Sequence, residues 1–369
     1  MANSSTSSLI VTEIPVEGYA KVLRFQNPDV GLDAIISIHD LALGPALGGI
    51  RIHPYANFDA ALNDVLRLSK GMTYKSALAE CRTGGGKSVV IADPKSPNKA
   101  QILEAYAEAI NYLKGDYIAA EDVGCSPKDM AVLAKFTPYV VGLEFEGSSG
   151  NPSPFTAWGT FLGIQALLNK TYGSKEISGR TIAVQGLGSV GAKLVEFLFW
   201  HGAKLVLSDI DENKAKEIAA FYGAEFVPCS EILKVPCDVL APCAMGGILN
   251  PESIVDLRCR AIGGCANNQL LKETDGDELR RLGILYAPDF VINAGGLVNV
   301  TQELESVGYD SNASRTKVAK IYDQLMLIFD IAQQNNCSTN RAAISLAEYR
   351  IKYGIGKRLE PVQFALEKK

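Results

Sequence analysis

The sequence predicts an α/β protein of two domains, the second of them a parallel sheet with helices on both faces. From about residue 147 onward, apolar runs of strand length alternate regularly with longer amphipathic segments. In that half, residues 186–191 form a glycine-rich turn between a strand and a helix, with the spacing of a dinucleotide-binding loop. Residues 147–154, rich in glycine, serine and proline, predict the hinge between the domains.

The composition is that of an ordinary globular protein, whose 369 residues are 47% hydrophobic and 21% charged, enough to build two cores. No apolar run reaches membrane-spanning length, and residues 1–8 lack the basic and apolar segments of a signal peptide. We therefore expect a frayed N-terminal tail and a cytoplasmic protein. The net charge of -5 offers no basic surface for nucleic acid.

The cysteines and histidines indicate neither a metal site nor a hydrolase. The eight cysteines include no Cys-x-x-Cys pair and no histidine at a metal-binding spacing, so we expect no metal and reduced thiols. None of the three histidines lies beside a serine or cysteine elbow, which argues against a hydrolytic triad.

The first half mixes strands, expected at 34–38 and 89–91, with amphipathic helices expected near 57–80 and 99–113. In the first helix, apolar residues recur at intervals of three and four, the spacing of one helix face. The series is Ala61, Val65, Leu68 and Met72, and its next member is Lys75. Because a buried ammonium is costly, we expect Lys75 to face an interior or a cleft for a chemical reason.

Lys87 ends a run of three glycines, residues 84–86, and precedes a strand. The Gly-Lys-Ser sequence resembles a phosphate-binding P-loop, but Cys81 stands where that loop needs its first glycine, and a strand follows where it needs a helix. We reject the P-loop. The glycines are expected instead to let the backbone bend tightly and approach a small ligand, with Lys87 projecting over it.

Asp122 follows a short strand predicted at 116–120 and lies where that strand meets a loop. A carboxylate at such a place either joins the two lysines in a site or caps the loop. The residues alone leave both roles open.

The second half contains a dinucleotide fold in its usual order. A strand at 181–184 leads into the fingerprint at 186–191, and a helix at 192–200 is followed by a strand at 205–207 that ends in Asp209. The pyrophosphate is expected at the helix N-terminus, where backbone N–H groups and the helix dipole favour an anion. Asp209 would accept hydrogen bonds from the adenosine ribose and repel a 2′-phosphate, which favours NAD over NADP.

Further strands are expected at 239–244, 261–268 and 290–296, and in such sheets ligands bind at the carboxyl ends of strands. Asn268 and Asn293 are therefore placed for cofactor or substrate, with ordinary turn asparagines as the alternative. The expected cofactor-binding residues are Gly186, Gly188, Ser189, Val190, Gly191, Asp209, Ala244, Asn268, Asn293 and Thr156.

Six segments together resemble the amino-acid dehydrogenase superfamily of glutamate, leucine, valine and phenylalanine dehydrogenases, and most closely its leucine dehydrogenase branch. They are residues 45–51, 71–75, 84–87, 120–124, 147–154 and 293–296. The resemblance implies NAD-dependent, reversible oxidative deamination of an L-amino acid to its 2-oxo acid and ammonia.

The resemblance also implies the catalytic roles. Lys75 would bind the substrate carboxylate, Lys87 would be the general base that activates water, and Asp122 would relay protons to and from the amino nitrogen. Burial and a second cation would lower the pKa of Lys87, while Asp122 limits that shift. Asn293 would hold the nicotinamide or the substrate amino group.

Substrate choice is implied by fewer positions. Leu47 stands where glutamate dehydrogenases have a lysine, so glutamate is disfavoured, and Ala120, Val318 and Ile321 match a branched-chain pocket. Leucine is the first choice, with valine and isoleucine next; phenylalanine and a non-catalytic NAD-binding sensor or scaffold are the alternatives. The expected substrate-binding residues are Lys75, Leu47, Gly48, Gly49, Ala120, Asn293, Val318 and Ile321.

The resemblance assigns residues 1–145 to a substrate-binding and oligomerisation domain, completed by C-terminal helices at 340–369. Residues 146–335 would be a Rossmann NAD-binding domain, with the chemistry in a cleft between the two. We expect a homo-oligomer, and an octamer from the branch.

Overall fold

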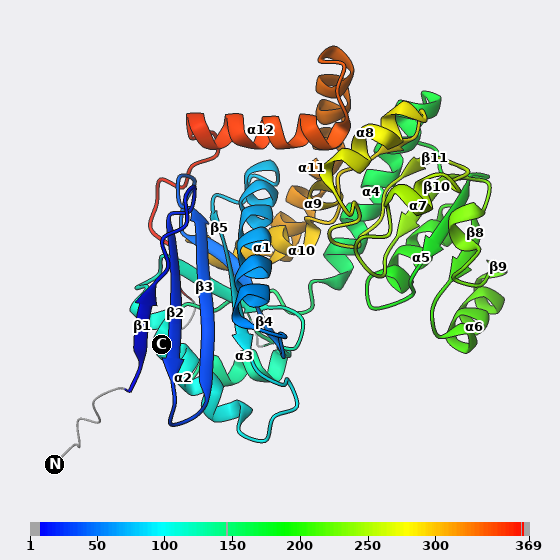
Figure 1. The fold of residues 1–369 in the computed structure, drawn as a ribbon. Helices are drawn as coiled ribbons and strands as arrows, with labels where there is room; N and C mark the ends of the chain where they lie inside the picture. The colour runs from blue at the N-terminus through cyan, green and yellow to red at the C-terminus, as the bar shows by residue number, and fades with distance from the viewer. Residues whose placement is uncertain (1–7, 145–146, 363, 365–369) are drawn as a thin grey trace. The chain divides into compact units, whose positions relative to one another are not determined.

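The computed structural model describes residues 8–144, 147–362 and 364, and these divide into two compact units (Figure 1). Unit 1 contains Met1–Asn151, Val300–Asp310 and Arg350–Lys369; unit 2 contains Pro152–Asn299 and Ser311–Tyr349. The expected boundary at 145–146 and most of the expected tail at 1–8 fall outside the described residues. The chain returns to unit 1 twice, whereas the sequence predicted one return near residue 340.

Unit 1 is built on a mixed six-stranded sheet in the order β1-β2-β3-β5-β4-β6. Neighbours from β1 to β5 are antiparallel, whereas β4 runs parallel to both β5 and β6. The strands are β1 (Ile10–Glu13), β2 (Lys21–Asn27), β3 (Leu32–Asp40), β4 (Ala46–His53), β5 (Gly84–Ile91) and β6 (Tyr117–Glu121).

Helices cover both faces of this sheet because β3 alternates its side chains between two cores. Ile36 and Ile38 belong to a core with α2 (Lys99–Tyr112) and α3 (Pro127–Leu133), while Ile35 belongs to a second core with α1 (Phe58–Leu78). Both long helices of this half were predicted. Figure 1 shows α1 lying along the strands.

The glycine run lies inside β5 and does not bend, which corrects the predicted tight turn. None of the three glycines has a positive φ, and each has hydrogen-bonded strand neighbours. A Cβ at Gly85 would lie 2.1 Å from Oγ1 of Thr73 on α1, so Gly85 lets helix and strand touch. Ser69 and Thr73 are fully buried on the contact face of α1, and the predicted apolar stripe through Leu68 and Met72 lies at its half-buried flank.

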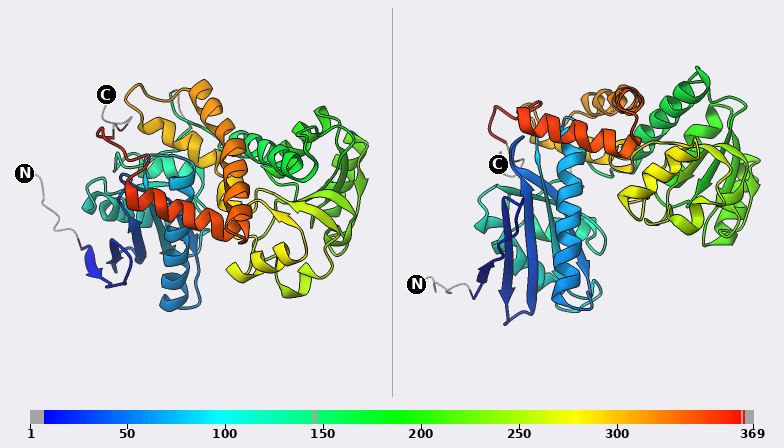
Figure 2. Two further views of the ribbon diagram at one scale, coloured as in Figure 1. Left: turned by 90° about the horizontal axis from the view of Figure 1, so that it is seen from above. Right: turned by 45° about the horizontal axis from the view of Figure 1, so that its top comes forward.

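Unit 2 contains a six-stranded sheet of entirely parallel strands in the order β12-β11-β10-β7-β8-β9. This confirms the predicted doubly wound fold. The strands are β7 (Thr181–Gln185), β8 (Lys204–Ser208), β9 (Glu225–Phe226), β10 (Cys237–Pro242), β11 (Cys259–Ile262) and β12 (Leu285–Tyr286). Figure 2 shows the same ribbon from two further sides.

The remaining helices follow residue 152; those at 295–301 and 339–353 span the division between the units, and the turn at 302–304 belongs to unit 1. They are α4 (Ser153–Tyr172), α5 (Gly191–Trp200), α6 (Glu212–Tyr222), α7 (Pro251–Ile254), α8 (Glu273–Arg281), α9 (Asp289–Ile292), α10 (Gly295–Thr301), α11 (Ser311–Gln334) and α12 (Thr339–Tyr353), with short 3₁₀ turns at Ile232–Lys234 and Gln302–Leu304. In the described part of the chain, no helix is long and apolar enough to cross a membrane.

The strand predicted at 290–296 is wrong, because these residues form α9 and the start of α10. Pro288 precedes α9, and the Ile292 N–H donates to the Pro288 carbonyl. A short apolar run fits a buried strand and a buried helix equally well, so hydrophobicity alone does not separate them.

Candidate active site

Buried Lys87 and half-buried Asp122 form an ion pair, with the Lys87 Nζ 3.0 Å from Asp122 Oδ2. Lys87 lies on β5 and Asp122 directly follows β6, so the two side chains must reach across the intervening strand β4. They do so at Gly49, where a Cβ would lie 3.0 Å from the Lys87 Nζ and 2.7 Å from the Asp122 Cβ. A glycine at this position thus leaves the space in which the pair meets.

Gly48 lets β4 lie close to the neighbouring strand β5. A Cβ at Gly48 would lie 1.8 Å from the carbonyl oxygen of Gly86, and the Tyr117 hydroxyl donates to the Gly48 carbonyl at 2.8 Å. In this structure the space beside both glycines of the Leu47–Gly48–Gly49 segment is occupied by the protein's own atoms. Their expected part in substrate binding stays a prediction.

The pair has perturbed proton affinities. Burial lowers the pKa of Lys87, Asp122 opposes that effect, and the cation of Arg51 adds to it. Burial by itself raises the pKa of Asp122, but the attraction of Lys87 and Arg51 outweighs burial, so the net pKa is lowered. Lys87 therefore releases its proton more readily than a free lysine, while Asp122 stays ionised.

Arg51, Asp64 and Tyr55 extend this centre, and the sequence assigned them no role. The Arg51 Nε donates to Asp122 Oδ2 at 2.9 Å, and its Nη1 donates to Asp64 Oδ2 at 2.9 Å. The Tyr55 hydroxyl donates to the same Asp64 oxygen at 2.6 Å. Arg51 belongs to one of the segments that carry the family resemblance. Its charge between Ile50 and Ile52, both buried, was the signal that could have identified it as a site residue.

The remaining predicted residues of unit 1 lie around these strands. Lys75 is half-buried near the end of α1, two residues beyond Thr73, which meets Gly85 of β5. Leu47 is buried on β4, and half-buried Ala120 on β6 pairs with Gly49.

In unit 2, the fingerprint glycines each meet a different steric demand. Gly186 has a φ of +95°, and a Cβ at Gly191 would lie 2.0 Å from the Gly186 carbonyl oxygen. Gly188 has no atom within 4 Å of a Cβ position, so its backbone is open to a ligand. Val190 provides no side-chain cap to α5, and in its first turn the Ala192 N–H donates to the Gly188 carbonyl at 3.0 Å; a helix N-terminus without a side-chain cap can hold an anion.

Asp209 directly follows β8 and holds this loop. Its Oδ2 accepts the Leu187 backbone N–H at 2.6 Å, and its Oδ1 accepts that of Asp211 at 3.0 Å. Burial raises the pKa of Asp209, but these backbone donors outweigh burial and lower it. Exposed Ser189 belongs to the same loop, and exposed Ala244 lies against Gly186.

Asn293 presents a buried acceptor without a partner. Its Nδ2 donates to the Cys265 carbonyl at 3.2 Å and to Asn267 Oδ1 at 2.8 Å, while its Oδ1 accepts no hydrogen bond among the described residues. A backbone carbonyl can only accept, so it defines which end of the amide is the donor. The open Gly188 backbone and this orphan oxygen fit a dinucleotide with its carboxamide group. Asn268 is exposed with a φ of 52°.

Val318 and Ile321 lie on α11 and pack against α4. A Cβ at Gly159 would lie 2.6 Å from Ile321 Cδ1 and 3.3 Å from Val318 Cγ1. Thr156 is on α4, which begins at Ser153, and its Oγ1 would lie 2.7 Å from a Cβ at Gly296.

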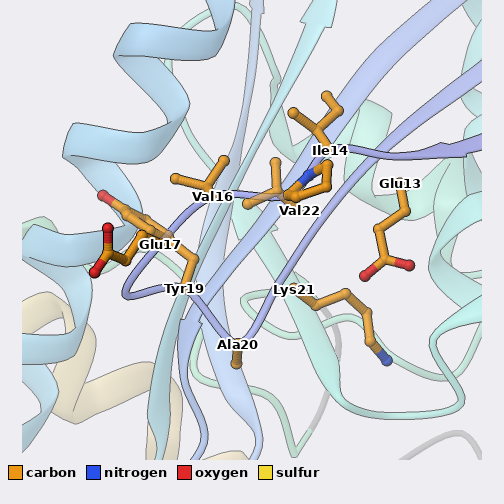
Figure 3. A pocket seen from close by; sticks show the side chains of 9 residues that line it. Glu13, Ile14, Val16, Glu17, Tyr19, Ala20, Lys21 and Val22 are labelled. Carbon is orange, nitrogen blue, oxygen red and sulfur yellow. The ribbon is translucent and has the colours of Figure 1, made fainter.

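A hollow in the β1–β2 hairpin, lined by residues 13–17 and 19–22, contains none of the predicted site residues (Figure 3). Glu13 and Lys21 lie toward one side of it and Glu17 and Tyr19 toward the other. We therefore assign it no part in the chemistry.

Residues 20–139 match the dimerisation domain of the Glu/Leu/Phe/Val dehydrogenases, and residues 206–352 match the glutamate/leucine/phenylalanine/valine dehydrogenase domain. Leucine dehydrogenase from Thermoactinomyces intermedius is 44% identical over 334 residues, covering 90% of this chain and 91% of that protein. L-tryptophan dehydrogenase from Nostoc punctiforme is 46% identical over 335 residues, covering 90% and 94%. The crystal structure of L-tryptophan dehydrogenase from Nostoc punctiforme has a TM-score of 0.81 at 44% identity, covering 91% of this chain and 96% of that one.

Proposed function

Because the chain belongs to the Glu/Leu/Phe/Val dehydrogenase family of NAD-dependent amino-acid dehydrogenases, we propose that it oxidatively deaminates branched-chain L-amino acids, leucine first. The products are the 2-oxo acid, ammonia and NADH, and the reaction is reversible. The observation that carries the proposal is the ion pair between buried Lys87 and Asp122, 3.0 Å apart over Gly49.

Each charged residue then has one task. Lys75 binds the substrate carboxylate, and NAD, when bound, would supply the acceptor for the hydride from the substrate Cα. Lys87 in its neutral form takes a proton from the water that adds to the resulting imine, which its lowered pKa favours. Asp122 carries a proton to the departing amino nitrogen. In unit 2, the Gly188 backbone, the α5 N-terminus and Asp209 would hold the dinucleotide.

The choice of an aliphatic substrate rests on the absence of charge and on side-chain size. Buried Leu47 provides no partner for a second substrate carboxylate, so glutamate is disfavoured. Ala120, Val318 and Ile321 would line an apolar pocket. An aromatic substrate is the second candidate, favoured by the 46% identity to a protein named L-tryptophan dehydrogenase.

The test is NADH formation by the purified protein with leucine, isoleucine, valine, phenylalanine, tryptophan and glutamate, each with NAD and with NADP. Turnover led by leucine and confined to NAD supports the proposal. Turnover led by an aromatic amino acid keeps the mechanism and contradicts the pocket. A folded protein that binds NAD but turns over no amino acid would instead be a sensor or scaffold.

We also propose that residues 1–145 carry the substrate site and subunit contacts, and residues 146–335 the dinucleotide. The match of residues 20–139 to a domain named for dimerisation supports a homo-oligomer. An octamer is the expected state, and light scattering coupled to size-exclusion chromatography measures it directly.

A further inference from the structure

We propose that Arg51 is a positioning residue that holds one oxygen of Asp122 and so presents the other to the substrate nitrogen. This inference rests on the proposed deamination, because it assigns Asp122 the proton transfer. Arg51 itself contacts only protein groups in the bonds described above.

The carboxylate of Asp122 is used asymmetrically. Lys87 on β5 and Arg51 on β4 both contact Oδ2, at 3.0 and 2.9 Å. Within the described residues, Oδ1 of Asp122 accepts no hydrogen bond. Two cations on one oxygen restrict rotation of the carboxylate and direct its second oxygen, which is the arrangement a proton relay needs.

The guanidinium of Arg51 is held at two points. Its Nε donates to Asp122 and its Nη1 to Asp64, and the Tyr55 hydroxyl fixes the same Asp64 oxygen. A planar fork can bridge two carboxylates in this way, whereas a lysine ammonium offers one flexible point charge. Arg51 is thus braced by α1, which carries Asp64.

The charges alternate from the interior to the surface. The ion pairs link Lys87 to Asp122, Asp122 to Arg51, Arg51 to Asp64 and Asp64 to Arg67. The side chain of Lys87 is 7% exposed and that of Arg67 is 60% exposed. Each buried charge therefore has an opposite neighbour, which offsets the cost of removing it from water.

Several groups face the pair and must be counted in any pH dependence. Lys87 faces Asp122, Arg51 and, farther away, Asp64. Glu121 also approaches Asp122; burial first, and then Glu144 and Asp122, raise the pKa of Glu121. Arg51 lowers the pKa of Lys87, so removal of Arg51 is expected to move the ascending limb of the pH–rate profile to higher pH.

The experiment compares Arg51→Gln and Arg51→Lys with Arg67→Gln in leucine oxidation by the full-length enzyme. Arg67→Gln is the matched control, because it removes the same kind of charge from the same Asp64 without touching Asp122. Arg51→Gln should lower kcat by about 10- to 100-fold and change KM by less than about threefold. The midpoint of the ascending limb of its pH–rate profile should lie at higher pH than in the wild type. Arg51→Lys should recover only part of kcat, while Arg67→Gln should stay within about twofold of the wild type.

If wild-type protein turns over amino acids and Arg51→Gln keeps its kcat and pH profile, the positioning role is wrong and the proposed function stands. If the wild type turns over none, the function fails first. Should Arg51→Gln not fold, Tyr55→Phe replaces it, since it removes the 2.6 Å bond to Asp64. A kcat and pH profile for Tyr55→Phe identical to wild type, together with full activity of Arg51→Lys, would also overturn the inference.

Discussion

The Lys87 ammonium lies beside Gly49, in space that a side chain at position 49 would need: a Cβ there would lie 3.0 Å from the Lys87 Nζ. The same Cβ would lie 2.7 Å from the Asp122 Cβ and 2.8 Å from the Glu121 carbonyl oxygen. Gly49 has no positive φ, so its value lies in the space it leaves and not in its backbone freedom.

Gly49→Ala is expected to lower kcat by about 100-fold or more, because the added methyl group displaces Lys87 from Asp122. Circular dichroism and a melting curve establish that the variant is folded. Gly49→Ala should add almost nothing to the loss in a Lys87→Ala background, since both changes disable the same pair. Additive losses in the double variant would show that Gly49 acts elsewhere.

The rate of deamination should rise with pH as Lys87 loses its proton. Burial and Arg51 lower the pKa of Lys87 from 10.5, so the ascending limb of the pH profile of kcat/KM should have a midpoint below that value. Lys87→Ala should remove this limb and lower kcat by about 10²- to 10⁴-fold. Near-normal deamination by Lys87→Ala at every pH would mean that another group is the base.

Asp209→Ser is expected to weaken NAD binding and to narrow the discrimination against NADP by about tenfold or more, because a negative charge near the 2′-phosphate is removed. It also removes the acceptor of the Leu187 N–H, so KM should rise for both cofactors. Asp211→Ser is the control: serine can still cap α6, and the Leu187 contact remains. If wild type and Asp209→Ser discriminate equally between NAD and NADP, the role assigned to Asp209 in cofactor choice is wrong.

Glu303 provides a stability test within unit 1. Burial raises the pKa of Glu303 above 4.5, although its Oε1 accepts the N–H groups of Gly142 and Ser149. A carboxyl whose pKa is raised by folding contributes its full stability below its unfolded pKa and loses it as pH rises through the folded pKa. Glu303→Gln keeps an acceptor but does not ionise.

Urea unfolding should therefore show little difference between wild type and Glu303→Gln near about pH 4, and a more stable variant at about pH 8. Glu303→Ala should be less stable by about 1–3 kcal/mol at both, because two buried donors lose their acceptor. A Glu303→Gln variant that is less stable than wild type at about pH 8 would show that the ionised carboxylate is favourable there.

Local patterns predicted the elements with strong periodicity. The helix periodicity of α1 and α2 and the strand, glycine turn, helix and acid of β7 to β8 each lie within a short stretch of chain. Short apolar runs were less reliable, as α9 shows, because four residues cannot distinguish a buried helix from a buried strand. The glycines before Lys87 were read as a bend because the sequence does not show that α1 packs on them.

The sequence by itself determined the family, the two-part α/β fold and the dinucleotide cofactor, since these depend on motif order and local spacing. It also identified Lys75, Lys87 and Asp122 as candidates, and their roles stay predictions. Only the tertiary structure decided that Lys87 and Asp122 meet over Gly49 and that Arg51 donates to the same oxygen of Asp122 that Lys87 contacts. Those relationships depend on the order β5-β4-β6 and on the register between strands, which bring together side chains from distant parts of the chain.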